Sequence, residues 1–367
     1  MKKKYQKSVL VGLSGGVDSA VAALLLKQDG YEVTGAFMIN FSNTKNTFEE
    51  CNYLVDKKEA QKIAAILDIP LLILNFEKQY RKHVIDPMFK SYARGLTPNP
   101  DSLCNKIIKF PLLWKEARKR NINYIATGHY IKKVEKNNQF YLKIPGDKTK
   151  DQSYFLYNLT QSDLKHTLFP ISNLTKQEVR AIAHKNNFPN YNKPSTNGIC
   201  FIGKVDMKKF LKKKIKPKTG KAIDPKGNII GEHDGIMYYT IGERIGERYG
   251  IKINKSYRNK TKKKLYVINK HAHSNVLTIA PENHPSSFRK KFKIIKINWI
   301  TEKPYLPLNV KIRIRHLGKL HNATIKLEKD KLICVLKNPL PDIAPGQSCV
   351  IYKNRTNIIL GGGEIRF

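Results

Sequence analysis

The sequence predicts an α/β fold, in which a parallel-sheet domain is followed by a small central module and a C-terminal antiparallel β-barrel. Strand-like and helix-like segments alternate through the first half of the chain, as in a parallel sheet covered by helices on both faces. From about residue 285 onward, short alternating runs are separated by turn residues, which is typical of a small barrel. With 367 residues and 41% apolar content, the chain can form two or three cores.

We expect domains at residues 1–205, 206–282 and 283–367. In the first domain, the apolar pattern predicts strands at "KSVLVGL", "YEVTGAFMI", "LLILNF" and "NYIATGHY", and helices around residues 18–29, 53–67 and 104–120. In the last domain it predicts strands at "FKIIKINWI", "NVKIRIRH", "ATIKLE", "KLICVLK", "SCVIYK" and "NIILGG". The segment between them has turns such as "DPKG" and hairpin-like alternation, and we leave its fold open.

A Gly-Gly turn joins the first expected strand to the first expected helix, in "VLVGLSGGVDSAVAALLL" (residues 9–26). Glycines allow the backbone to approach an anion, and the N–H groups of the first helical turn point toward it. The turn therefore predicts a phosphate site, and we expect neither Gly15 nor Gly16 to tolerate a side chain. The alternative is an ordinary tight turn with Asp18 or Ser19 as the N-cap. The Walker pattern and its lysine are absent.

The pattern S-G-G-x-D-S resembles the pyrophosphate loop (PP-loop) of ATP pyrophosphatases, which implies a nucleotide-binding domain that cleaves ATP between its α and β phosphates. Asp18 is then expected to help hold Mg²⁺ on the departing pyrophosphate. Ligands of such sheets bind at the carboxyl ends of the strands, which adds Met38 and Gly128, although Met38 also suits a core position. The expected ATP-binding residues are Gly12, Leu13, Ser14, Gly15, Gly16, Val17, Asp18, Ser19, Met38 and Gly128.

The chain is strongly basic, with 68 Lys and Arg against 29 Asp and Glu and a net charge of +39. This predicts a polyanionic partner, most simply nucleic acid, although a proteome-wide bias toward lysine would also add charge. No apolar run reaches the roughly 18 residues that span a membrane. The start "MKKKYQKSVL" is a poor signal peptide. We therefore expect a soluble, cytoplasmic protein without a membrane partner.

In the expected barrel, "KIRIR" places Ile312 and Ile314 on one face of a strand, and Lys311, Arg313 and Arg315 on the other. Such a basic stripe suits an RNA backbone. If Arg313 contacts one phosphate, Arg313→Ala should lower the salt slope of binding by about one.

The chain has five cysteines and no C-x-x-C pair, so neither a disulfide scaffold nor a metal centre is expected. Cys104, in "GLTPNPDSLCNKIIKF", follows two prolines where a helix should begin, which predicts a lowered pKa; a buried, inert thiol is the alternative. Cys200 lies in the loop "KPSTNGICFIG". Cys51, Cys334 and Cys349 are expected to be structural. Two loop thiols beside an ATP-activating fold suggest sulfur chemistry.

Seven blocks occur in order, namely S-G-G-V-D-S, "TPNPDSLCNKIIKF", "ATGHY", "KDQSYFL", "GICFIG", "MYYTIGERIG" and "PGQ". Together they resemble the bacterial tRNA-specific 2-thiouridylases over essentially the whole chain. The resemblance implies ATP-dependent adenylation of the 2-oxygen of the wobble uridine, followed by attack of a persulfide sulfur at C2 with loss of AMP. It assigns the persulfide to Cys200 and makes Cys104 the second catalytic thiol, which either closes a disulfide or releases sulfide.

The same resemblance implies contacts with the anticodon region of tRNA, whose target base must leave its stack. The implied residues are Asn99, Pro100 and Asp101 near the base, and His129, Lys150, Asp151, Gln152, Arg313, Ile314 and Gln347 toward the rest of the tRNA. The family usually has Arg-Tyr where this chain has Arg313-Ile314, so an aromatic available for stacking is lost there.

Two other classes of function are compatible with part of this sequence: another PP-loop enzyme and a non-catalytic RNA-binding protein. A lysidine synthase or a 2-thiocytidine enzyme would share the Gly-Gly loop, but the first does not need two loop thiols and the second should show paired cysteines. A non-catalytic RNA-binding protein would form no AMP. The sequence leaves open the upstream sulfur donor, the preferred tRNAs and the oligomeric state.

Overall fold

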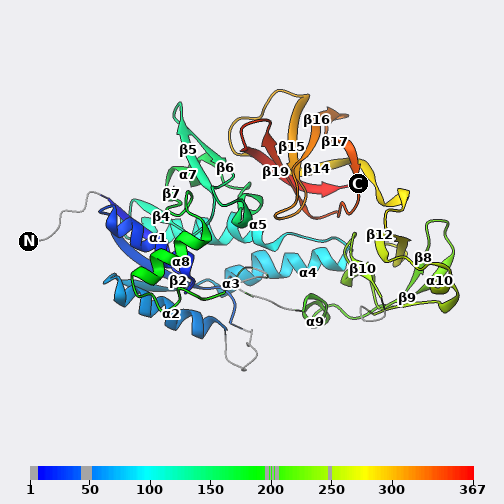
Figure 1. Ribbon diagram of the computed structural model, residues 1–367, viewed down its shortest axis with the longest axis horizontal. Coiled ribbons are helices and arrows are strands. Elements are labelled where there is room, and N and C mark those ends of the chain that lie inside the picture. The colour runs from blue at the N-terminus through cyan, green and yellow to red at the C-terminus, as the bar shows by residue number, and fades with distance from the viewer. Residues whose placement is uncertain are drawn as a thin grey trace, which may run out of the picture.

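A computed structural model describes residues 7–42, 52–194, 198, 200, 202, 206–246 and 250–367. Figure 1 shows the α/β module at the left, the central module at the right and the barrel above them. The expected fold class is confirmed by this arrangement. The residue boundaries between the expected domains stay a prediction.

The α/β module is built on a parallel sheet with the strand order β3-β2-β1-β4-β7. Its strands are β1 (Ser8–Gly12), β2 (Glu32–Ile39), β3 (Leu71–Asn75), β4 (Tyr124–Ala126) and β7 (Thr167–Leu168). All four strands expected here are present, and β7 is an addition. Because β1 pairs with β2 on one side and β4 on the other, the loops after β1 and β4 meet at a switch point, where ligands of such sheets bind.

Helices cover both faces of this sheet. One face carries α1 (Val17–Gln28), α2 (Asn52–Ile66) and α8 (Lys176–Lys185), and the other carries α6 (Phe110–Arg118). The strand side chains alternate accordingly, since Val9 and Val11 pack with α1 while Leu10 packs with α6. Both faces of β1 are therefore buried, as its unbroken apolar sequence predicts.

The helical region expected around residues 104–120 is divided into α5 (Pro100–Cys104), the π-helical turn η2 (Asn105–Lys109) and α6. A second helical stretch was not expected from the sequence. It consists of α3 (Glu77–Tyr80), the π-helical turn η1 (Arg81–Ile85) and α4 (Asp86–Ala93). Its buried residues, among them Tyr80 and Met88, share a core with the central module, so this stretch attaches the two modules to each other.

The central module contains a sheet with the strand order β10-β12-β13-β8-β9-β11. Its elements are α9 (Met207–Lys212), β8 (Gly220–Ile223), β9 (Ile229–His233), the 3-10 turn η5 (Ile236–Tyr238), β10 (Arg244–Ile245), β11 (Ile251–Ile253), α10 (Lys255–Lys260), β12 (Leu265–His271) and β13 (Val276–Pro281). Apart from the parallel β13–β8 pair, neighbouring strands run antiparallel, which agrees with the hairpin-like alternation of this segment.

The C-terminal barrel contains all six strands that the alternating pattern predicts. They are β14 (Arg289–Trp299), β15 (Leu308–Arg313), β16 (His321–Glu328), β17 (Lys331–Leu340), β18 (Ser348–Lys353) and β19 (Ile358–Arg366). The β14–β19 pairing closes the sheet. A hairpin of the α/β module, β5 (Lys132–Lys136) and β6 (Gln139–Lys143), extends the same sheet through β19, so the two modules share backbone hydrogen bonds.

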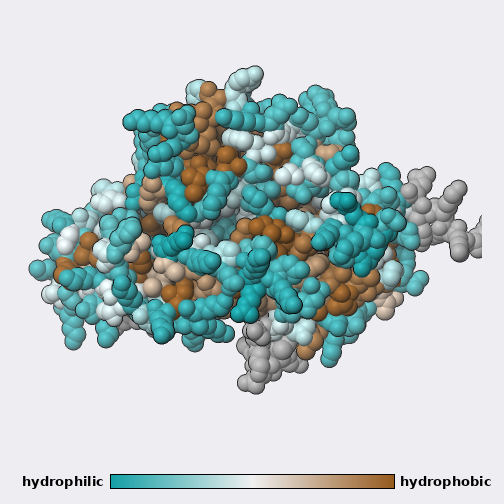
Figure 2. Space-filling model, turned by 180° about the vertical axis from the view of Figure 1, so that it is seen from behind, coloured by the Kyte–Doolittle hydropathy of each residue, from teal (hydrophilic) through white to brown (hydrophobic). Residues whose placement is uncertain are grey.

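Four shorter elements complete the description: η3 (Lys148–Lys150), η4 (Ser153–Phe155), α7 (Gln161–Lys165) and η7 (Pro285–Ser287). Among the described residues, no helix combines the length and apolar character needed to cross a membrane. Figure 2 shows a face of the molecule that is mostly hydrophilic, with hydrophobic residues gathered in limited patches.

Candidate active site

The Gly-Gly turn lies at the switch point of the parallel sheet, between the end of β1 and the start of α1. Gly15 has φ +73°, and a Cβ there would lie 2.3 Å from the Asp56 carbonyl oxygen. Gly16 is the N-cap of α1, and no side chain caps the first turn of this helix. Uncapped N–H groups at a helix start favour an anion. The turn therefore has the backbone of a phosphate-binding loop.

The glycine expectation holds at Gly15. At Gly16 the nearest protein atom to an added Cβ is the Ser14 hydroxyl oxygen at 3.4 Å, so the expectation there rests on the approach of an anion and stays a prediction. Gly128, after β4, does need to be glycine, since a Cβ there would lie 2.6 Å from the backbone of Asp18 and Ser19. The close approach of this loop to α1 joins Gly128 to the loop at residues 12–19. Met38 is buried among core residues near the end of β2, and its expected contact with the nucleotide stays a prediction.

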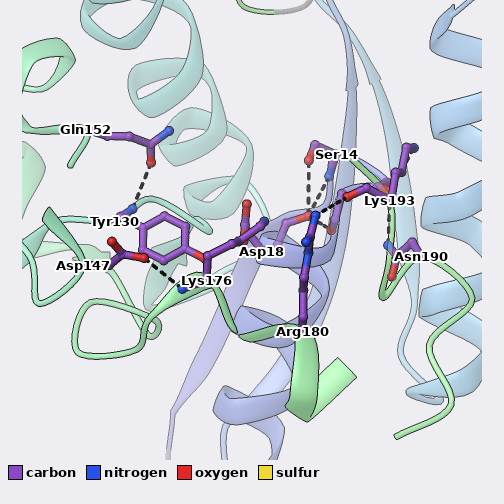
Figure 3. Close-up of polar contacts among 12 residues, drawn as sticks. Ser14, Asp18, Tyr130, Asp147, Gln152, Lys176, Arg180, Asn190 and Lys193 are labelled. Atoms are coloured by element: carbon purple, nitrogen blue, oxygen red, sulfur yellow. Dashed lines mark hydrogen bonds and ion pairs between the residues drawn. The ribbon is translucent and has the colours of Figure 1, made fainter. Parts of the chain in front are cut away.

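Three basic side chains that sequence reasoning missed surround this loop (Figure 3). Lys176 Nζ lies 2.6 Å from Asp18 Oδ1, and Lys193 Nζ lies 3.2 Å from the Gly15 carbonyl oxygen. Arg180, one helical turn beyond Lys176, has a buried Nε without a hydrogen-bond partner. The three side chains add positive charge beside the start of α1, where Lys193 also forms an ion pair of 2.7 Å with Asp56. Only the T-x-x-E capping box at residues 175–178 marks the helix of Lys176 and Arg180 in the sequence.

Asp18 is held by two donors from different elements. Tyr130 donates its hydroxyl to Asp18 Oδ1 at 2.7 Å, and Lys176 contacts the same oxygen. Burial and the neighbouring Asp18 raise the pKa of Tyr130, so its hydroxyl stays a donor. Burial lowers the pKa of Lys176, and Asp18 partly offsets this. The carboxyl group of Asp18 is thus oriented beside the start of α1.

The described residues include no cluster of three or more His, Cys, Asp or Glu side chains suited to a metal ion. Mg²⁺ that travels on phosphates needs only one or two protein carboxylates, since waters and phosphate oxygens complete its shell. Asp18 is such a carboxylate, so the donor set beside the loop fits a Mg²⁺ ion that is carried by phosphates.

A second centre is formed by Cys104 and Cys200, which the structure brings into hydrogen-bond contact although they are far apart in sequence. Asn99 caps α5 by accepting from the Ser102 N–H at 3.1 Å, with Pro100 as the first helical residue. Cys104 therefore lies at the end of α5, and the expectation that it begins a helix is wrong. Burial and the nearby Cys200 raise the pKa of Cys104 well above its ordinary value, which also corrects the expected lowering.

The backbone of Cys200 is held on both sides. Its N–H donates to Asp101 Oδ1 at 2.7 Å, and its carbonyl accepts from the Tyr80 hydroxyl at 2.6 Å. The pKa of the Cys200 thiol is lowered, because the hydrogen bond from Cys104 and the positive charge of Lys109 outweigh the effect of burial. Cys200 is therefore the more acidic thiol of the pair.

His129 connects this centre to the Gly-Gly loop. It is buried, with Nδ1 2.8 Å from Thr127 Oγ1 and Nε2 3.4 Å from Lys109 Nζ. Burial and the Lys109 charge lower the pKa of His129 well below its ordinary value, so the ring is neutral. His129 faces the interior of the protein in this structure.

A cavity of about 440 Å³ lies where the three modules meet. Five of the residues that sequence reasoning placed at the tRNA line it, namely Asn99, Pro100, Asp101, Ile314 and Gln347. The cavity also contains an aromatic pair, Phe155 and His316, whose ring centroids are 4.4 Å apart. This pair shares the lining with Ile314, so the cavity has flat aromatic surface.

The other expected tRNA residues lie on the segment after η3. Gln152 accepts from the Tyr130 N–H at 2.9 Å, and Lys150 is half-buried. Asp151 is buried and forms an ion pair of 2.5 Å with Arg313, which is itself only 8% exposed. The exposed basic stripe expected on β15 is therefore wrong at Arg313, because its charge is used to join the barrel to the α/β module.

Arg313→Ala is expected to destabilise the protein and to leave the salt slope of RNA binding unchanged. Removing the guanidinium leaves the Asp151 carboxylate buried without a counter-charge, which costs about 3–5 kcal/mol in buried pairs of this kind. Calorimetric unfolding and binding titrations at several salt concentrations measure the two effects. A lower salt slope at unchanged thermal stability would instead mean that Arg313 contacts a phosphate.

Comparison with known proteins covers nearly the whole chain. Family models match in succession: a tRNA methyl transferase HUP domain at residues 7–204, a tRNA methyl transferase PRC-barrel domain at 208–281 and an aminomethyltransferase beta-barrel domain at 289–365. The tRNA-specific 2-thiouridylase MnmA of Nitrosomonas eutropha is 42% identical over 361 residues, covering 97% of this chain and 98% of the relative. The tRNA-specific 2-thiouridylase MnmA 2 of Aliarcobacter butzleri is 39% identical, covering 98% of each chain.

Proposed function

Since this chain belongs to the tRNA-specific 2-thiouridylases, a family of tRNA sulfurtransferases, we propose that it replaces the 2-oxygen of the wobble uridine of tRNA with sulfur in two steps, the first of which consumes ATP. The observation that carries the proposal is the hydrogen-bonded pair of Cys104 and Cys200, one thiol acidic and the other held protonated. A lysidine synthase or a simple RNA-binding protein has no need of such a pair.

The first step is adenylation of the uridine 2-oxygen. ATP binds with its β and γ phosphates at the uncapped start of α1, and the leaving group is pyrophosphate. Lys176, Arg180 and Lys193 neutralise the charge that develops there. Asp18 would hold a Mg²⁺ ion carried by the nucleotide, and that ion would further stabilise the departing pyrophosphate. The uridine oxygen attacks the α phosphorus, and pyrophosphate departs with the electrons of the α–β bridge. Adenylation converts the uridine 2-oxygen, which is a poor leaving group, into an oxygen of AMP, which leaves readily.

The second step is sulfur transfer from a persulfide on Cys200. Its terminal sulfur attacks C2 of the adenylated uridine, and AMP leaves. Cys104 then attacks Cys200 Sγ, the bond between Cys200 and the transferred sulfur breaks, and the products are 2-thiouridine and a Cys104–Cys200 disulfide. In the alternative order, Cys104 first attacks Cys200 Sγ of the persulfide, which forms the disulfide and releases sulfide. The sulfide then attacks C2 of the adenylated uridine and displaces AMP. Either route ends with a disulfide that an external thiol must reduce.

The test of the proposed function is nucleoside mass spectrometry of tRNA treated with the protein, ATP and a persulfide donor. We expect 2-thiouridine at the wobble position, with AMP and pyrophosphate as coproducts. The Cys104→Ser variant separates the two routes, because only the first leaves tRNA joined to Cys200 through a disulfide. AMP formation without any thionucleoside would refute the thiolation, and the absence of AMP would leave only RNA binding.

Lys176→Met is expected to slow AMP formation by about 10²–10³-fold, the loss typical of removing one preorganised stabiliser of developing charge. Lys176 reaches the loop beside Asp18, whereas Lys185 at the far end of α8 is exposed. Lys185→Met therefore removes the same charge from the same helix without touching the loop and should keep wild-type activity. Equal losses in both variants, measured by release of labelled AMP, would count against a local role.

A further inference from the structure

The ammonium group of Lys109 lies at the junction of the two centres. It forms a hydrogen bond to the Cys200 sulfur, and it also lies near Cys104 and Asp101. On its other side it is 3.4 Å from His129 Nε2, and the neighbouring Gly128 packs on the first turn of α1. None of the sequence motifs singles out this lysine as functional.

The π-helical turn explains how Lys109 reaches the thiols. Lys109 follows Cys104 by five residues, which on an α-helix would separate the two side chains by about 140° around the axis. In a π-helical turn the i and i+5 residues are joined by the backbone hydrogen bond instead, so Lys109 returns to the side of Cys104. The turn η2 (Asn105–Lys109) occupies these five residues. The π-helical turn η2 therefore places Lys109 on the side of the helix that carries the Cys104 thiol.

The charges around Lys109 and Cys200 favour an ammonium ion beside a thiolate. Burial alone would lower the pKa of Lys109, but the adjacent Cys200, Cys104 and Asp101 raise it, so the side chain is an ammonium ion. His129 is neutral and supplies no competing charge. The remaining titratable neighbours are Asp101, which burial makes harder to ionise, and Tyr80, whose pKa is raised. Lys109 is therefore the positive charge that faces Cys200 among the described residues around it.

We propose that Lys109 is the counter-ion of the reactive sulfur: it holds Cys200 as a thiolate that accepts sulfur, and then holds the terminal persulfide sulfur as an anion. The first role is a property of the protein alone, while the second rests on the proposed thiolation. In the loading step the Cys200 thiolate attacks the outer sulfur of a donor persulfide, the donor S–S bond breaks, and the donor leaves as a thiol. Cys104 keeps its proton meanwhile, because the ammonium already stabilises the charge on Cys200.

The test follows alkylation of Cys200 by iodoacetamide as a function of pH, without ATP or tRNA, and quantifies the modified peptide by mass spectrometry. In the wild-type protein the midpoint should lie below the free-thiol value of about 8.5. In Lys109→Met we expect it to rise by about one unit or more, so that alkylation at neutral pH slows about tenfold. Lys109→Arg should retain most of the wild-type profile.

Lys106 provides the matched control, since it belongs to the same π-helical turn but is exposed. Lys106→Met removes one positive charge at nearly the same place in the sequence and should leave the alkylation profile unchanged. A comparable upward shift in Lys106→Met, or an unchanged profile in Lys109→Met, would overturn the proposal.

A second measurement does not require a change at Lys109 and so is independent of whether its variants fold. The thiolate absorbance of the wild-type protein minus that of Cys200→Ser should show an ionised thiol at neutral pH, and its absence would overturn the proposal. If the alkylation profile shifts as expected but tRNA is never thiolated, the counter-ion role stands and the proposed function fails.

Discussion

Asp18→Ala is expected to abolish AMP formation while leaving tRNA binding nearly intact. Asp18 Oδ1 accepts from Tyr130 and Lys176, so its removal releases both donors as well as the oxygen proposed to bind Mg²⁺. We expect a loss of at least about 10²-fold, since preorganised electrostatic groups around a leaving group are worth that much each. Release of labelled AMP from ATP in the presence of tRNA measures the effect, and a separate titration measures tRNA affinity.

Two further substitutions sharpen this result. Asp18→Asn keeps the size of the side chain and an acceptor for Tyr130 but removes the charge, so it should lose nearly as much activity as Asp18→Ala. Asp29→Ala removes an exposed carboxylate at the opposite end of α1 and should behave as wild type. Parallel losses of AMP formation and tRNA binding in Asp18→Ala would indicate that Asp18 maintains the fold and has no specific role at the loop.

The strands of this fold were predictable because their signal is local. Val9 to Val11 form an aliphatic run that is buried on both faces, and the barrel strands alternate with period two. The stretch at residues 77–93 was missed because its apolar residues, such as Tyr80 and Met88, face a different module. The β5–β6 hairpin was missed for a similar reason, since it completes its pairing with β19.

The candidate site also contains residues that the sequence predicts and residues that it does not. The Gly-Gly loop and Gly128 follow from strand ends and close backbone approach, which the sequence encodes locally. Lys176 and Arg180 reach that loop through the packing of α8 on α1, and Lys193 reaches it from the segment that follows α8. Arg313 was placed on an exposed face because period two predicts which face a side chain takes but says nothing about what covers that face. Its partner, Asp151, is 162 residues away in sequence.

The acidity of the thiols was assigned to the wrong cysteine for a physical reason. A helix start lowers the pKa of a thiol only at the first turn, and Cys104 lies at the end of α5. Burial then dominates and raises its pKa. The acidity belongs to Cys200, where a neighbouring thiol donates and an ammonium is close. No local feature of the loop around Cys200 predicts these two contacts.

The two thiols should therefore differ when the protein meets a small-molecule persulfide. Intact-mass measurement should show one added sulfur atom on Cys104→Ser and none on Cys200→Ser, although both variants lose thiolation. The serine at position 104 retains a hydroxyl that can donate to Cys200, so the acidity of Cys200 is largely kept in that variant. Cys104 alone cannot accept sulfur readily, because burial holds it as the unreactive thiol.

Both variants should still release pyrophosphate from ATP with tRNA, since adenylation depends on the loop at residues 12–19 and not on the thiols. This separates a loss of sulfur chemistry from a loss of folding. Cys349→Ala is the control for nonspecific loading, because Cys349 is fully buried in the barrel beside Cys334; it should gain sulfur as the wild-type protein does. Loading of Cys200→Ser but not Cys104→Ser would exchange the two roles. Peptide mapping that places the added sulfur on Cys334, Cys349 or Cys51, which lies outside the described residues, would mean that the reactive thiol lies outside the Cys104–Cys200 pair.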